Sequence, residues 1–79
     1  MELESENREF GPQPLGDILA AKGLQNHDLV AASTEQLTHK MVSKAVRGRF
    51  VSSRIRQKIL RALNIATGEV YTLQQLVTY

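Results

Sequence analysis

The amino-acid sequence predicts an all-α protein built from five short helices. Apolar residues recur at three- and four-residue spacing, which is the period of one helix face. Glycine, proline or a capping residue separates each such run from the next. No stretch alternates apolar and polar residues for long, and no hairpin signal such as Asn-Gly occurs, so strands are not expected.

The chain of 79 residues has room for one domain. Residues 1–11 carry few apolar side chains and lead into Pro12 and Pro14. We therefore expect a flexible acidic arm over residues 1–11 and a helical domain over residues 12–79.

The first two helices are predicted from the residues at their boundaries. Pro14 suits a first helical turn, Asp17 complements the helix dipole there, and Gly23 ends the run. Asn26 is a favourable N-cap for a short second helix that reaches Ser33. A turn over residues 33–36 follows.

The third helix, expected over about residues 38–47, has two different faces. Leu37, Met41 and Ala45 recur every four residues, with Val42 beside them, and predict the buried face. The other face carries a polar and cationic stripe formed by Lys40, Ser43, Lys44 and Arg47. Gly48 ends the helix.

The last two helices are bounded in the same way. Ser52 or Ser53 is expected to cap a fourth helix that continues to the break at residues 66–68, and Thr72 to cap a terminal turn or two. The apolar content near the chain end suggests a homodimer surface made of Tyr71, Leu73, Leu76 and Val77, with Tyr79 beside them. Ordinary packing of this segment onto the first helix is the alternative.

The net charge of +2 conceals an uneven distribution, because residues 1–9 carry −3 and the remainder carries +5. Residues 36–68 contain no acidic residue and eight basic ones, namely Lys40, Lys44, Arg47, Arg49, Arg54, Arg56, Lys58 and Arg61. Such a segment suits a polyanion, since each neutralised phosphate releases condensed counterions. The alternative is a solvated helical face.

Two short helices in succession, the second with a cationic stripe, are typical of the helix-turn-helix motif. Residues 15–63 resemble the phage-repressor and Cro-like helix-turn-helix family. The pieces that match are residues 24–30 (LQNHDLV), Leu37-Thr38, residues 41–44 (MVSK) and Arg47-Gly48-Arg49. The sequence departs from the family in two places: the turn over residues 33–36 is longer and lacks glycine, and Val30 replaces a small residue.

The resemblance implies a lambda-repressor-like bundle that acts as a small transcriptional regulator, with the third helix in a DNA major groove. The residues expected to contact bases are His39, Lys40, Ser43 and Lys44. The residues expected to contact phosphates are Asn26, Thr38, Arg47, Arg49, Ser52, Ser53 and Arg54. For Asn26 and the hydroxyl side chains, helix capping is the alternative role. Arg56, Lys58 and Arg61 can face solvent and are left out of the predicted site.

Catalysis is not expected, because the sequence has neither a phosphate-binding glycine loop nor a Gly-x-Ser-x-Gly pattern. The chain lacks cysteine, and His27 and His39 are too few and too far apart in the sequence for a metal site, so no metal or cofactor is expected. No apolar run is long enough for a membrane helix, and residues 1–9 do not resemble a signal peptide. A cytoplasmic, nucleoid-associated location is expected.

Double-stranded DNA is the expected partner. The alternative is a helical protein–protein adaptor that presents the same basic face to an acidic partner. RNA is less favoured because the chain has few aromatic residues to stack on bases. The acidic arm gives a further hypothesis, in which it folds over residues 40–49 and competes with DNA.

Overall fold

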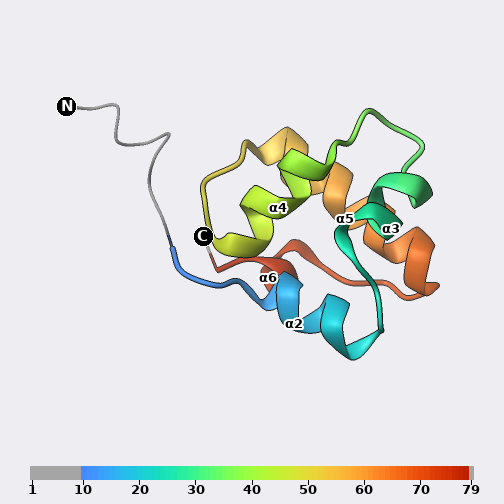
Figure 1. Ribbon diagram of the computed structural model, residues 1–79, viewed down its shortest axis with the longest axis horizontal. Coiled ribbons are helices and arrows are strands. Elements are labelled where there is room, and N and C mark those ends of the chain that lie inside the picture. Colours follow the sequence, from blue (N-terminus) through green and yellow to red (C-terminus); the bar gives the residue numbers. More distant parts are fainter. Residues whose placement is uncertain (1–9, 79) are drawn as a thin grey trace.

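The structure, a computed structural model, describes residues 10–78. Five helices follow one another along this part of the chain (Figure 1): α2 Pro14–Ala21, α3 Asn26–Ala32, α4 His39–Arg47, α5 Ser53–Thr67 and α6 Leu73–Leu76. No strand forms within residues 10–78. The predicted all-α class and the five helices are confirmed, whereas nearly all of the predicted arm lies outside the described residues.

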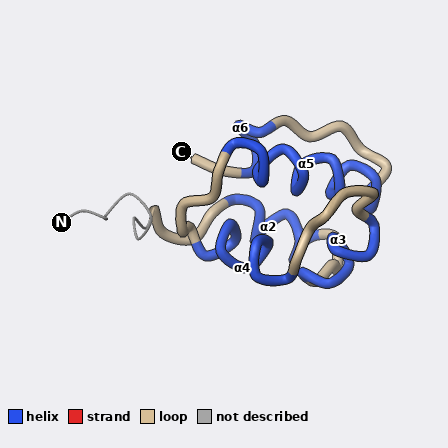
Figure 2. Tube along the Cα trace, turned by 90° about the horizontal axis from the view of Figure 1, so that it is seen from above, coloured by secondary structure: helices blue, strands red, loops and turns tan. Residues whose placement is uncertain are grey.

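The helices divide into two groups around a shared core. Figure 2 shows α5 and α6 on one side of the bundle and α2, α3 and α4 on the other. The long helix α5 contacts α3, α4 and α6, and α2 contacts α4 and α6. Since α3 and α4 also contact each other, this pair packs on α5, and α2 packs on α4.

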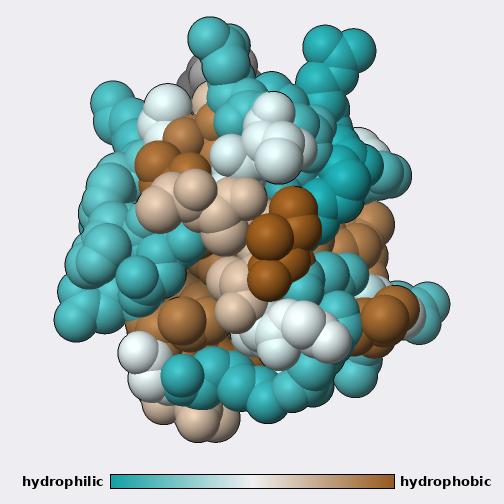
Figure 3. Space-filling model, turned by 90° about the vertical axis from the view of Figure 1, so that its right-hand side faces the viewer, coloured by the Kyte–Doolittle hydropathy of each residue, from teal (hydrophilic) through white to brown (hydrophobic). Residues whose placement is uncertain are grey.

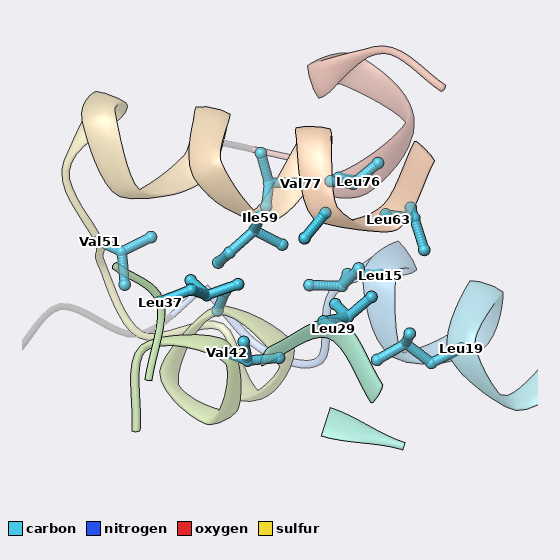
Figure 4. Close-up of a cluster of buried hydrophobic side chains, with 12 residues drawn as sticks. Leu15, Leu19, Leu29, Leu37, Val42, Val51, Ile59, Leu63, Leu76 and Val77 are labelled. Carbon is cyan, nitrogen blue, oxygen red and sulfur yellow. The ribbon is translucent and has the colours of Figure 1, made fainter. Parts of the chain in front are cut away.

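Every helix contributes at least one fully buried side chain to the core (Figure 4). Leu15, Leu29, Val42, Leu63 and Leu76, one from each helix, are at most 1% exposed. Removing such apolar surface from water stabilises a fold by about 25 cal/mol per Å². The apolar residues that recur along each helix therefore pack together in one continuous core.

The helix starts agree with the sequence except at α3. Thr38, Ser52 and Thr72 occupy N-cap positions as expected. At α3 the N-cap is Gln25, whose backbone N–H donates to Asp28 Oδ2 at 2.7 Å. The expectation that Asn26 caps α3 is wrong, because Asp28 supplies the acceptor from within the helix and leaves Asn26 as its first residue.

The connection between α3 and α4, residues 33–38, is fixed by α5. Arg61 donates two hydrogen bonds to the Glu35 carboxylate, from Nε at 2.5 Å and from Nη2 at 2.7 Å. Lys58 Nζ donates to the Gln36 carbonyl oxygen at 3.1 Å. Arg61 is exposed as expected and Lys58 is half-buried, but both side chains are engaged, because the turn brings these acceptors within their reach.

The segment before α2 lies across the C-terminal end of α4 (Figure 1). The backbone N–H of Phe10 donates to the Gly48 oxygen at 2.7 Å, and that of Gln13 donates to the Val46 oxygen at 3.2 Å. The side chain of Gln13 is buried, and its Oε1 accepts from the backbone N–H of Thr78 at 2.6 Å. Both ends of the described chain therefore meet at the end of α4.

The C-terminal segment packs into its own chain. Leu76 and Val77 are 1% and 7% exposed, and α6 contacts α2 and α5. The prediction that Leu76 and Val77 form a homodimer surface is wrong, because their side chains complete the core. Tyr71 and Leu73 are half-buried, and Tyr79 lies outside the described residues.

Large apolar side chains stay exposed elsewhere. Ile65, near the C-terminal end of α5, is 55% exposed, and Val70, in the loop after it, is 89% exposed. Figure 3 looks onto the side of the molecule where α3 and the end of α5 lie, and apolar groups adjoin one another across the middle of this face, with polar groups around them.

Candidate nucleic-acid interface

The exposed side of α4 carries the cationic stripe that the sequence predicts. Val42 and Ala45 turn the inner side of α4 into the core, where they are 0% and 1% exposed. On the outer side Lys40 and Arg47 are exposed and Lys44 is half-buried. These three cations share one side because they are separated by whole helical turns. Within residues 10–78 none of them forms an ion pair.

His39, the first residue of α4, lies beside α3, and Ser43, one turn further along α4, is half-buried. The ring centroid of His39 is 6.1 Å from that of His27, which follows the first residue of α3. The two histidines, distant in sequence, are therefore neighbours in space, and His27 Nε2 lies 3.5 Å from Asp28 Oδ1. In the described part of the chain no group of three or more potential metal ligands forms.

The first turns of α4 and α5 differ electrostatically from those of α2 and α3. Asp17 in α2 and Asp28 in α3 complement the positive end of the helix dipole. The first turns of α4 and α5 contain no acidic residue, and they carry Lys40 and Arg54 instead. Because a cation beside a positive helix end is unfavourable, this arrangement is consistent with a surface that receives an anion.

Two of the residues predicted to contact phosphates, Thr38 and Ser52, line a hollow between α4 and the beginning of α5. Lys40 and Lys44 line the same hollow. Thr38 Oγ1 accepts from the backbone N–H of Met41 at 3.2 Å, so its hydroxyl also caps α4. Ser52 caps α5 in the same way. The other members of the predicted set are Asn26 beside His27, Ser53 and Arg54 in the exposed first turn of α5, and Arg47 and Arg49 on either side of Gly48.

The apolar side of this hollow was not predicted from the sequence. It is formed by Met41, Phe50, Val51 and Ile55. Met41, assigned to the buried face of the third helix, is only half-buried and lies at the edge of the core. Phe50 is 38% exposed. An aromatic residue in a short link between two helices was the sequence feature that could have indicated this apolar side.

Arg56 contributes to the same region. Its Nη1 donates to the Val51 oxygen at 3.1 Å, and its guanidinium carbon lies 5.7 Å from the ring centroid of Phe50. The expectation that Arg56 faces solvent is wrong, because the link between α4 and α5 folds back within its reach. Its contacts hold that link against α5.

Two ion pairs outside α4 engage Arg61 and Lys22. The hydrogen bond from Arg61 lowers the pKa of Glu35 below its usual value and raises that of Arg61. The hydrogen bond between Lys22 and Glu69 lowers the pKa of Glu69 and raises that of Lys22 in the same manner. Arg61 and Lys22 are therefore engaged within the chain, whereas Lys40, Lys44 and Arg47 of α4 form no ion pair among residues 10–78.

None of the helices in residues 10–78 has the length and apolar character needed to cross a membrane. Comparison with protein-family models, with curated proteins and with solved structures found no match. A function for this chain is therefore inferred from its own surface.

Proposed function

We propose that this chain is a sequence-specific DNA-binding protein and a small transcriptional regulator, in which α3 and α4 form a helix-turn-helix pair. The observation that carries the proposal is the one-sided character of α4. Val42 and Ala45 close its inner side, whereas its outer side carries Lys40, Lys44 and Arg47 without an ion-pair partner among residues 10–78. An α-helix with such a side fits the major groove.

In this proposal the bundle is lambda-repressor-like, and the contact of α3 with α4 and the support of both by α5 favour that arrangement. Base edges meet His39, Lys40, Ser43 and Lys44. Phosphates meet Arg47 and Arg49 at one end of α4, and Asn26, Thr38, Ser52, Ser53 and Arg54 around its start. Lysine donors suit guanine O6 and N7, whereas arginines beside a helix end suit phosphate oxygens.

Fluorescence anisotropy with a labelled random duplex tests the proposal. Wild type should bind with an affinity that falls steeply as salt rises, and Lys44→Ala should bind more weakly. Arg47→Ala should lower the slope of log K against log salt by about one unit, because one phosphate contact is lost. Lys22→Ala is the matched control, since Lys22 is paired with Glu69.

Each outcome of this titration is informative. An unchanged slope for Arg47→Ala, or an equal decrease for Lys22→Ala, would contradict a contact specific to α4. Absence of binding even at about 50 mM salt would contradict DNA binding and favour the helical adaptor that uses the same face on an acidic protein.

The attachment point of the arm favours a second, regulatory part of this proposal. Phe10 is hydrogen-bonded to Gly48, which lies between Arg47 and Arg49. Residues 1–9, with their net charge of −3, are therefore joined to the chain beside the proposed phosphate contacts. We expect deletion of residues 1–9 to tighten DNA binding at low salt, measured by the same titration. An unchanged affinity would contradict the hypothesis that the arm competes with DNA.

A further inference from the structure

A hollow of about 310 Å³ lies between α4 and the beginning of α5. In Figure 1 the link over residues 48–52 runs back from the C-terminal end of α4 to the level of its first turns, where α5 begins. Lys40 and Lys44 of α4 stand on one side of the hollow, with the hydroxyl residues Thr38 and Ser52 nearby. The link and α5 supply most of its apolar lining.

The apolar lining is incompletely buried. Val51 is 4% exposed and belongs to the core, but Met41 and Ile55 are half-buried and Phe50 is 38% exposed. A hollow that keeps apolar side chains accessible beside a few polar groups is the usual form of a ligand site. The complementary ligand therefore carries an apolar group next to groups that accept hydrogen bonds from lysine.

We propose that this hollow seats the C5-methyl group of a thymine, next to the base edges that Lys40 and Lys44 contact. The inference rests on the proposed DNA-binding function and assigns to it one base preference. In the major groove the thymine methyl is the apolar group that base edges offer, and thymine O4 and guanine O6 and N7 are acceptors for lysine.

The distribution of charge favours a DNA strand over an acidic peptide. If only the hollow is considered, a peptide with one leucine beside one aspartate would match its apolar lining and its lysines equally well. The cations do not stop at the hollow, however, because Arg47 continues the same side of α4 one turn further on. A DNA strand matches such a row, because its base edges face Lys40 and Lys44 while one of its phosphates lies against Arg47, and the methyl group enters the hollow beside the two lysines.

Paired duplexes that differ only in the methyl group test the inference. Anisotropy titrations compare an alternating adenine–thymine duplex with the same duplex containing uracil in place of thymine. Wild type should prefer the thymine duplex about fourfold, the equivalent of burying one methyl group. Phe50→Ala should lose this preference and keep its salt dependence. Ile65→Ala, which truncates an exposed apolar residue outside the hollow, should keep both.

The failures of the two proposals are distinguishable. Failure of wild type to bind either duplex overturns the proposed function and this inference with it. Equal binding of both duplexes overturns only the thymine preference, and this result does not depend on the folding of any variant. A preference that survives in Phe50→Ala places the methyl contact elsewhere. Binding of a labelled Asp-Leu repeat peptide more tightly than the thymine duplex would assign the hollow to a protein partner.

Discussion

Gly48 meets two separate requirements at the end of α4. Its φ of +90° lies in the left-handed region that terminates a helix. A Cβ atom at this position would also lie 1.8 Å from the Gly11 carbonyl oxygen. The residue therefore permits both the helix end and the close approach of the N-terminal segment, which fixes the backbone between Arg47 and Arg49.

Substitution of Gly48 should reveal both requirements. Gly48→Ala should lower the free energy of unfolding by about 3 kcal/mol or more, because the left-handed penalty is joined by displacement of Gly11. Gly68→Ala is the matched control, since Gly68 has a φ of +72° and an added Cβ meets no atom within 4 Å. It should cost about 1 kcal/mol. Equal losses in urea unfolding would show that the contact with Gly11 contributes nothing.

At the scale of elements, the connection between α3 and α4 depends on α5. The turn is longer than a tight helix-turn-helix turn and contains no glycine, and Arg61 and Lys58 hold it through Glu35 and Gln36. Leu37, 6% exposed, anchors its far end in the core. The relative orientation of α3 and α4 is therefore set by a third helix and by burial of one leucine.

The hydrogen bond between Glu35 and Arg61 should make stability depend on pH at the acidic end. Arg61 holds the pKa of Glu35 below its usual value in the folded chain, so unfolding raises that pKa. The stabilisation is complete above the unfolded-state pKa and is lost as the pH falls through the lowered folded-state pKa. Glu35→Gln should therefore lose less stability than wild type when urea unfolding is repeated at decreasing pH.

Arg61→Gln provides the control for this assignment, since it removes the partner and leaves the carboxylate. It should flatten the same part of the pH dependence, and combining it with Glu35→Gln should add little. If the free energy of unfolding of Arg61→Gln fell as steeply with decreasing pH as that of wild type, another titrating group would control stability in the acidic range.

For the whole molecule, the C-terminal segment closes the bundle. α6 joins α2 to α5, and Thr78 bonds to the buried side chain of Gln13 at the end of α4. Leu76 lies at the centre of this closure with 1% exposure. The segment is thus part of the structure that supports α4.

Leu76→Ala should destabilise the folded chain by about 2–5 kcal/mol, the range for truncating a buried leucine. The unfolding midpoint should fall by the same amount at every protein concentration, because Leu76 packs within its own chain. Val70→Ala, at an 89% exposed position, should stay within about 0.5 kcal/mol of wild type. If Leu76→Ala lost stability only at low protein concentration, the result would instead indicate that Leu76 contributes to a homodimer surface.

The sequence alone determined the helices and the outer side of α4. Helix periods, Thr38 and Ser52 as caps, and Gly48 and Gly68 as stops all act within a few residues, so local pattern is sufficient to predict them. The stripe of Lys40, Lys44 and Arg47 follows from the same period. The N-cap of α3 was misplaced by one residue because Gln25 and Asn26 are both polar and Asp28 decides between them.

Only the tertiary structure decided which charges are engaged and where the hollow lies. Glu35 precedes its partner Arg61 by 26 residues, and Gln13 precedes Thr78 by 65. The terminal leucine, Leu76, is buried because α2 and α5 leave a space that it fills, which periodicity cannot distinguish from a free apolar surface. Phe50 meets α4 only because the link folds back along it. Contacts between distant residues depend on how complete helices pack, and no local pattern encodes that packing.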